Sequence, residues 1–122
     1  MAVHNEMGQI GEEMARRYLV QNGYEIVETN WRLGRHEMDI IAYYKKTLVF
    51  VEVKTRRGDS FGAPESFVDR KKQRACIALA NAYILKNKRK EEARFDIISV
   101  VLNSSGATVE HIPNAFSAVG QY

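Results

Sequence analysis

Hydrophobic positions recur along the chain with two different periods, and the change of period predicts its elements. Between residues 7 and 22, apolar or small residues recur at helical spacing, and Gly23 is a natural stop for a helix. Residues 24–32 alternate between polar and apolar side chains, which predicts a strand. Residues 38–44 and 47–54 are rich in β-branched and aromatic side chains and predict two further strands, joined by a tight turn at Lys45 and Lys46.

The second half of the chain predicts one more helix and two more strands. Residues 57–63 have the composition of a loop, and Pro64 suits the first turn of a helix that runs to about Lys88. The apolar stripe of this helix is Val68, Lys72, Ala75, Leu79 and Tyr83. Residues 95–102 and 108–112 read as strands joined by a turn at residues 103–106. The predicted order is therefore α-β-β-β-α-β-β.

Composition restricts the class of protein. The chain has 122 residues, 45% of them hydrophobic, which is enough for one core without metal or disulfide cross-links, so we expect a single domain over residues 1–122. No apolar run approaches the roughly 20 residues of a membrane span, and the polar start lacks the features of a signal peptide. We therefore expect a cytoplasmic protein without a membrane partner. Cys76 is the single cysteine, which excludes an intramolecular disulfide and a thiolate metal cluster.

Charge is distributed unevenly. The formal net charge is +3, but residues 31–90 hold 15 basic and six acidic residues, a net charge of +9. The two ends together hold three basic and nine acidic residues, a net charge of −6. This asymmetry favours a polyanionic partner such as nucleic acid. The alternative is that charge runs such as Lys86–Lys90 are solvated helix ends.

Candidate chemistry follows from the predicted hairpin of residues 38–54. A turn that is symmetric about Lys45 and Lys46 places Asp39 opposite Glu52. The same register places Glu37 opposite Lys54. Two carboxylates directly across a strand pair lie within about 5.5 Å and repel each other unless a cation lies between them. Carboxylate oxygens without thiolate or histidine ligands favour Mg²⁺ or Mn²⁺ over zinc.

Glu52 interrupts an apolar run, Leu48–Val53, where an ionised carboxylate is costly unless it is paired or bound to a ligand. A structural alternative is an ion pair of Lys54 with Glu52 or Glu37 at the rim of the sheet. In the functional interpretation, the Lys54 ammonium activates an attacking water or neutralises an oxyanion. Glu12 lies at the edge of the first helix's apolar stripe and is the helix carboxylate that can reach this site.

Asp39 followed by Glu52-Val53-Lys54 on adjacent strands, behind a helix that carries a Glu, resembles the PD-(D/E)xK nuclease superfamily. Further segments match in order and together resemble the YraN-like family of small bacterial endonuclease-like proteins, which is similar to archaeal Holliday junction resolvases. These segments are Gly11-Glu12, residues 15–19, Asn30-Trp31-Arg32, residues 37–41, residues 50–56, Lys72-Gln73, Arg94-Phe95-Asp96 and Asn114-Ala115-Phe116.

The resemblance implies a fold, an activity and a set of roles. The fold is an α/β, restriction-endonuclease-like core whose central mixed five-stranded sheet is flanked by helices. Asp39 and Glu52 correspond to the metal-binding carboxylates, Lys54 to the catalytic lysine and Glu12 to an additional helix acid. The expected activity is Mg²⁺- or Mn²⁺-dependent hydrolysis of DNA phosphodiester bonds, on branched or junction DNA. The alternative is a catalytically silent nucleic-acid-binding or scaffolding protein with the same fold.

Other residues receive expectations of their own. Nucleic-acid contacts are expected from basic residues around the site: Arg32, Arg35, Arg56, Arg57, Arg70, Lys71, Lys72 and Arg74. For Lys72 the alternative is a lysine at the edge of the core. Arg94 and Asp96 are expected to form a structural pair, Cys76 to fill the core, and Phe61 and Gly62 to touch a nucleotide, whereas the three histidines are too scattered for a ligand set.

The resemblance to junction resolvases further suggests a symmetric homodimer. The apolar tail of residues 112–116, with Val119 and Tyr122, could contribute to its interface. The alternative is that this tail packs onto the core of its own chain.

Overall fold

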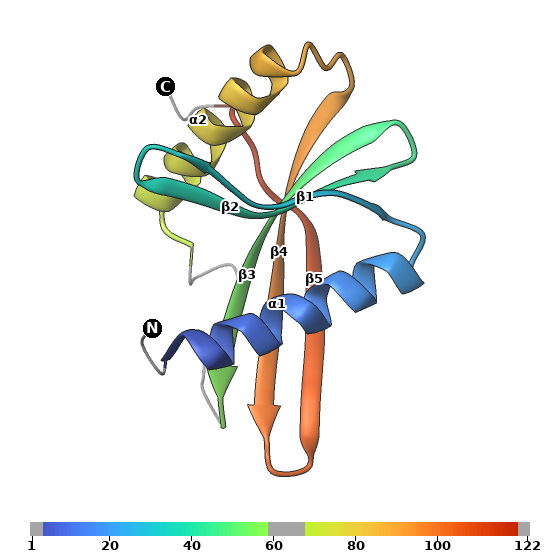
Figure 1. The fold of residues 1–122 in the computed structure, drawn as a ribbon, viewed down its shortest axis with the longest axis vertical. Helices are drawn as coiled ribbons and strands as arrows, with labels where there is room; N and C mark the ends of the chain where they lie inside the picture. Colours follow the sequence, from blue (N-terminus) through green and yellow to red (C-terminus); the bar gives the residue numbers. More distant parts are fainter. Residues whose placement is uncertain (1–3, 59–67, 120–122) are drawn as a thin grey trace.

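A computed structural model of the chain, which describes residues 4–58 and 68–119, consists of a five-stranded sheet between two helices (Figure 1). The elements follow in the predicted order. They are α1 (His4–Gln21), β1 (Glu25–Leu33), β2 (His36–Tyr44), β3 (Thr47–Arg57), α2 (Arg70–Lys86), β4 (Glu92–Asn103) and β5 (Gly106–Phe116). The prediction of an α/β fold with the order α-β-β-β-α-β-β is confirmed.

The sheet is mixed, as predicted. Its strands lie in sequence order, and the pairs β1–β2, β2–β3 and β4–β5 are antiparallel, whereas β3 and β4 are parallel. Two parallel strands cannot be joined by a tight turn, so α2 forms the connection between them. The β2–β3 hairpin has the predicted register, from Tyr44 opposite Thr47 to Ile40 opposite Val51. Lys45 and Lys46 both have positive φ, as the tight turn of such a hairpin requires.

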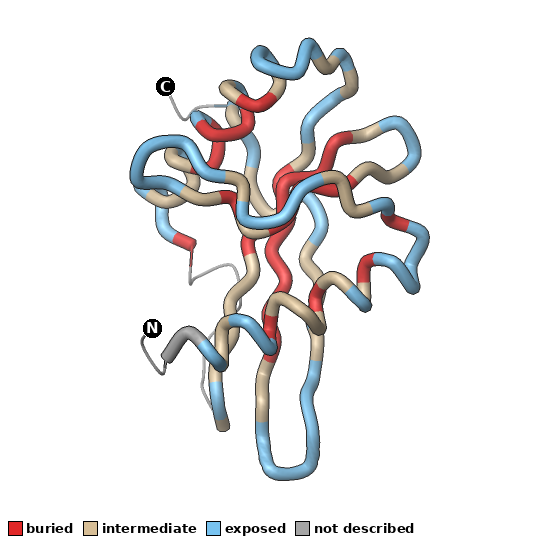
Figure 2. The backbone as a smooth tube through the Cα atoms, in the orientation of Figure 1, coloured by how far each residue is buried: buried red, intermediate tan, exposed pale blue. Residues whose placement is uncertain are grey.

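The two faces of the sheet bury two separate hydrophobic clusters. One cluster packs beneath α2, and it joins Phe50 of β3 to Leu79 and Tyr83 of the helix. The other packs beneath α1, whose Ala15 and Leu19 are fully buried as the helical spacing predicts. The central strands are therefore covered on both sides, and Figure 2 shows buried backbone running through the middle of the molecule.

The predicted start of the second helix is wrong. Pro64 lies outside the described residues, but Val68 precedes the helix, and α2 begins at Arg70 behind the N-cap residue Asp69. An Asp69 carboxylate oxygen accepts the backbone N–H of Lys72 at 2.9 Å, which satisfies one of the N–H groups that a helix start leaves unpaired. The helix ends at Lys86 rather than at about Lys88. Phe61 and Gly62 also lie outside the described residues.

The described end of the chain packs on its own core. The ring of Phe116 stacks on that of Phe95 with 5.2 Å between the ring centroids, and Ala118 packs against the same cluster. Val119 is exposed, and Tyr122 lies outside the described residues. In residues 4–58 and 68–119, no helix is both long enough and apolar enough to cross a membrane.

Candidate carboxylate site

Glu52 lies in the middle of β3 and is buried, with its side chain beneath the first turns of α2. Its Oε2 is 3.2 Å from the Nζ of Lys72, and its Oε1 is 3.8 Å from the Sγ of Cys76. Both oxygens are thus in contact with α2. The structural alternative from the sequence, an ion pair with Lys54, is wrong for Glu52: Lys72 makes that ion pair, and Lys54 acts on Glu52 only through its charge.

Asp39 lies on β2 where the pairing with β3 ends. The ladder stops at Ile40 and Val51, and beyond it the Oδ2 of Asp39 accepts the backbone N–H of Val53 at 2.8 Å. The Asp39 carboxylate therefore accepts the hydrogen bond of a β3 backbone N–H group, that of the residue directly after Glu52. The predicted position of Asp39 directly opposite Glu52 lies one step beyond the observed pairing, and the side chain of Asp39 instead contacts the backbone of the residue that follows Glu52.

The two carboxyl groups are unfavourably placed as a pair of anions. Burial and the charge on Glu52 raise the pKa of Asp39 well above its ordinary value of 3.8. Burial likewise raises the pKa of Glu52, and Lys72 and Lys54 offset this effect only in part. Each raised pKa means that folding disfavours the charged form, so the pair lowers the stability of the fold at neutral pH. Such a pair is more typical of a functional site than of a structural one.

Lys72 and Cys76 are kept in their ordinary protonation states by this environment. Burial alone would lower the pKa of Lys72, but the charge of Glu52 and the hydrogen bond to it outweigh burial and raise the pKa. Burial, followed by the charge of Glu52, raises the pKa of Cys76 to about 12. Cys76 is therefore a thiol that donates weakly to Glu52 and fills the core, as predicted, and it has no thiolate character.

Glu12 reaches the same region from α1. The Nδ2 of Asn30 donates to its Oε1 at 2.9 Å, and the charge on Glu12 contributes to the raised pKa of Asp39. Asn30 has a φ of 52°, a conformation that asparagine tolerates better than most residues. The charges of the other two predicted acids, Glu12 and Glu52, thus both act on Asp39.

The position of Glu12 depends on a close approach of α1 to β3. Gly11 is buried against Thr55, and a Cβ atom at position 11 would lie only 1.8 Å from the Thr55 Oγ1 and 2.8 Å from its Cβ. Rotation of the threonine could not remove the second overlap. Only glycine therefore allows the helix backbone to rest on β3 at this point, one residue before Glu12.

We expect Gly11→Ala to lower the free energy of unfolding by about 1–3 kcal/mol, because α1 must move away from β3. Gly8→Ala is the matched control, since a Cβ at position 8 of the same helix meets no atom within 4 Å. That control should raise stability by about 0.5–1 kcal/mol, because alanine favours a helix. Urea unfolding of the two variants measures both effects, and equal stability of the two would contradict the close approach.

Known proteins resemble this chain over almost its whole length. A model described as "Uncharacterised protein family UPF0102" matches residues 11–100. The chain is 47% identical over 116 residues to a UPF0102 protein of Phocaeicola vulgatus, covering 95% of this chain and 96% of that one. It is 45% identical over 114 residues to a UPF0102 protein of Caldanaerobacter subterraneus, covering 90% and 93% of the two chains. The chain belongs to the UPF0102 family. The predicted resemblance to the YraN-like family is thereby confirmed at family level.

The basic residues predicted to contact nucleic acid are spread over three parts of this UPF0102 chain. Arg32 and Arg35 lie at the β1–β2 turn, Arg56 and Arg57 at the end of β3, and Arg70, Lys71, Lys72 and Arg74 in the first turns of α2. Of the α2 group, Lys72 contacts Glu52 directly.

The predicted position of Glu37 opposite Lys54 is not part of the observed pairing. The backbone partner of Glu37 is Arg32 on β1, and the Nε of Arg32 is 3.3 Å from the Oε2 of Glu37. The structural alternative of a pair between Lys54 and Glu37 is thus wrong as well. The β2–β3 ladder ends before it reaches these positions, since Asp39 binds β3 through its side chain.

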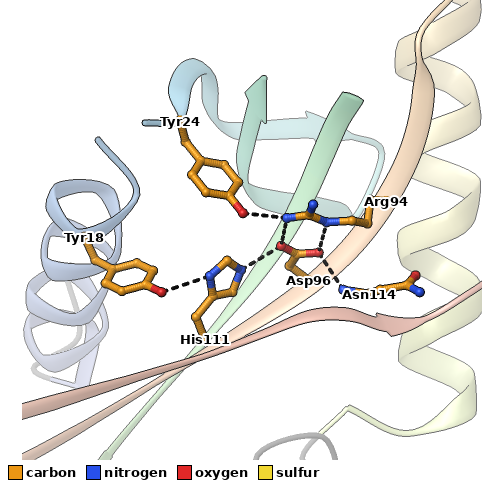
Figure 3. A network of polar contacts seen from close by, with 6 residues as sticks. All are labelled: Tyr18, Tyr24, Arg94, Asp96, His111 and Asn114. Carbon is orange, nitrogen blue, oxygen red and sulfur yellow. Dashed lines mark hydrogen bonds and ion pairs between the residues drawn. The ribbon is translucent and has the colours of Figure 1, made fainter. Parts of the chain in front are cut away.

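An extended polar network lies on the α1 side of the sheet of this UPF0102 chain, and only its Arg94–Asp96 pair was predicted from the sequence (Figure 3). Asp96 is fully buried, and the guanidinium of Arg94 binds both of its oxygens, at 2.9 and 2.7 Å. The predicted structural pair is therefore confirmed. The Nε2 of His111 lies 2.7 Å from the Oδ2 of Asp96, and its Nδ1 lies 3.1 Å from the hydroxyl of Tyr18. Because a carboxylate only accepts, Nε2 carries the proton.

His111 gave no signal in the sequence because its partners are distant along the chain. Tyr18 and His111 are 93 residues apart. The backbone N–H of Asn114 donates to the Oδ1 of Asp96 at 2.9 Å, so three elements, α1, β4 and β5, meet at this network. In the sequence of β4, Asp96 is flanked by the apolar residues Phe95 and Ile97. This apolar setting is a signal from which its burial could have been predicted.

Proposed function

We propose that this UPF0102 protein is a metal-dependent endonuclease that hydrolyses phosphodiester bonds of DNA, with Asp39 and Glu52 at its centre. The observation that carries the proposal is the pair formed by buried Glu52 and half-buried Asp39, in which burial and then the charge of Glu52 raise the pKa of Asp39. Carboxylates with strongly raised pKa values cluster at functional sites, which supports this proposal. The resemblance of Asp39, Glu52 and Lys54 to the PD-(D/E)xK pattern supports the same activity.

The donor set suits Mg²⁺ or Mn²⁺. Among the residues that the structure describes, no three His, Cys, Asp or Glu side chains form a ready ligand cage. Mg²⁺ does not need one, because it is commonly held by one or two carboxylates while water and substrate phosphate complete its coordination. Two adjacent carboxylates with raised pKa values are a pair that a divalent cation would stabilise. Asp39 and Glu52 would hold the ion, and when bound it would polarise the scissile phosphate.

The chain's own residues have separate tasks in this proposal. Lys54 follows Glu52 by two residues on β3 and its charge acts on Glu52, and in this proposal it would orient a water or stabilise developing negative charge. Asn30 fixes the carboxylate of Glu12 beside Asp39. The Val53 N–H fixes the carboxylate of Asp39.

A cleavage assay tests the proposal. Linear, flapped, forked and four-way DNAs are incubated with Mg²⁺, with Mn²⁺ and with a chelator. Metal-dependent cleavage of any of them supports the proposed function, and selective cleavage of branched forms supports the finer substrate. Binding without cleavage on every substrate, with either metal, would favour the silent nucleic-acid-binding protein instead. A symmetric homodimer, DNA rather than RNA as the partner, and a cytoplasmic location remain predictions.

DNA binding should weaken with salt, and the basic first turns of α2 should account for part of that dependence. Log affinity falls with log salt, and replacing the exposed Lys71 and Arg74 with Ala should reduce the magnitude of this negative slope by up to about two. The matched control removes two lysines at the β2–β3 turn, by Lys45→Asn with Lys46→Gly, residues that suit the positive φ of that turn. The control should keep the wild-type slope in fluorescence anisotropy titrations. Equal slopes for all three proteins would exclude α2 from the DNA footprint.

A further inference from the structure

Lys72, rather than the lysine of the strand motif, is in contact with the carboxylate pair. Its Nζ is 3.2 Å from the Oε2 of Glu52, and its charge also acts on Asp39. Lys54 lies two residues beyond Glu52 on the strand and does not take part in that ion pair. The site therefore has two lysines in different situations: Lys72 is bound to Glu52, whereas Lys54 forms no ion pair with a carboxylate in the part of the chain that the structure describes.

The contact leaves little room for a second cation on Glu52. Lys72 binds one oxygen of Glu52 and the thiol of Cys76 faces the other, while one oxygen of Asp39 is bound to the Val53 N–H. A divalent ion that binds both carboxylates would have to share Glu52 with Lys72 or displace it. Two cations a few ångströms apart repel strongly in a partly buried site.

Lys72 can leave its position without disturbing the fold. Its side chain is 38% exposed, whereas that of Glu52 is 6% exposed. The four methylene groups of lysine allow its ammonium to swing towards solvent while its backbone stays in the first turn of α2. In the sequence, Lys72 lies between the exposed residues Lys71 and Arg74. These residues are on the helix turns that we propose to face DNA phosphates.

We propose that Lys72 is a built-in counter-ion of the carboxylate pair, which holds Glu52 in the metal-free protein and is displaced when a divalent cation binds. The inference rests on the proposed metal-dependent function and specifies how its site is controlled. Lys72 is thus a positioning residue that acts through Glu52. Metal binding would thus release the Lys72 ammonium, which adds one positive charge to the turns of α2 that we propose to face DNA.

Mn²⁺ binding to the full-length protein, measured by electron paramagnetic resonance at alkaline pH, tests the competition. Lys72→Met should bind Mn²⁺ about tenfold more tightly than the wild type, because one competing charge is removed. Lys72→Arg should restore the wild-type affinity, and Lys71→Met is the matched control that should leave it unchanged. Wild-type binding with no gain in Lys72→Met would overturn the counter-ion role alone. Absence of Mn²⁺ binding in every protein would overturn the proposed metal site together with it.

A second measurement uses the wild-type protein and does not depend on the folding of a variant. The acylation rate of each lysine by an amine reagent is followed by peptide mass spectrometry with and without Mg²⁺. Lys72 should react several-fold faster with Mg²⁺ because it has left Glu52, and Lys71 should not change. In Glu52→Gln, Lys72 should react fast already and be insensitive to Mg²⁺. Equal Lys72 rates with and without Mg²⁺ in the wild type would contradict displacement.

Discussion

Replacing Glu52 with Gln is expected to lower the rate of metal-dependent DNA cleavage by at least about 100-fold. The substitution keeps the size of the side chain and removes the negative charge that the proposed ion needs. Replacing even a residue that only supports a metal ligand typically lowers metal affinity or activity by about 10–100-fold, so the loss of a ligand should be at least as large. Single-turnover cleavage of the best substrate in Mg²⁺ provides the measurement.

Two controls separate this loss from damage to the fold. Because burial raises the pKa of Glu52, the ionised carboxylate lowers the stability of the folded protein at neutral pH. Glu52→Gln should therefore unfold at a temperature no lower than the wild type. Glu37→Gln is the matched substitution, since Glu37 pairs with Arg32 on the neighbouring strand. It should retain cleavage within about threefold, as expected for an exposed ion pair. Full activity of Glu52→Gln would refute the proposed site.

Replacing Asp96 with Asn is expected to lower the free energy of unfolding by about 3–5 kcal/mol. The carboxylate is fully buried and accepts hydrogen bonds from Arg94, His111 and the Asn114 backbone. An amide group would place a donor against these donors and would leave the Arg94 guanidinium without its counter-ion. Removal of the fully buried member of an ion pair is costly because the other charge, here on half-buried Arg94, loses its partner away from bulk water.

The Arg89–Glu91 pair provides the matched control. It has the same spacing of two residues, but both of its side chains are partly exposed at the surface. Glu91→Gln should cost at most about 1 kcal/mol, the usual contribution of a surface pair. Chemical unfolding of the two variants at neutral pH compares the costs, and a similar small loss for both would contradict the importance of the buried network.

The same network predicts a dependence of stability on pH. Burial would raise the pKa of Asp96, but hydrogen bonds from His111 and Arg94 outweigh it and hold the pKa below its ordinary value of 3.8. A carboxyl with a lowered pKa stabilises the fold above its unfolded pKa, and this contribution is lost as the pH falls through its folded pKa. The stability difference between wild type and Asp96→Asn should therefore be constant above about pH 5 and shrink at lower pH.

The sequence alone determined the features that depend on near neighbours. Helical spacing and the stop residue Gly23 predicted α1, which ends at Gln21. Both signals act within a few positions of the chain. The symmetric turn at Lys45 and Lys46 predicted the β2–β3 register, because hairpin pairing follows directly from its turn. Since that register brings Asp39 next to the strand of Glu52, the carboxylate pair could also be predicted.

Local signals competed at the start of α2, and there prediction failed. Pro64 was a plausible first-turn residue, but Asp69 caps the helix at Arg70. Residues such as Asp, which can cap the start of a helix, are common in loops. Which of them caps a helix depends on how that helix packs.

Only the tertiary structure decided which side chains meet across the sheet. Lys72 contacts Glu52 because α2 crosses back over β3 on its way to β4, a path that no local pattern specifies. Asp96 meets His111, and His111 meets Tyr18, because β5 and α1 converge on the other face. Gly11 is required by the distance between α1 and Thr55. Periodicity assigns a residue to a face, whereas the identity of its partner follows from the packing of elements that are distant in the chain.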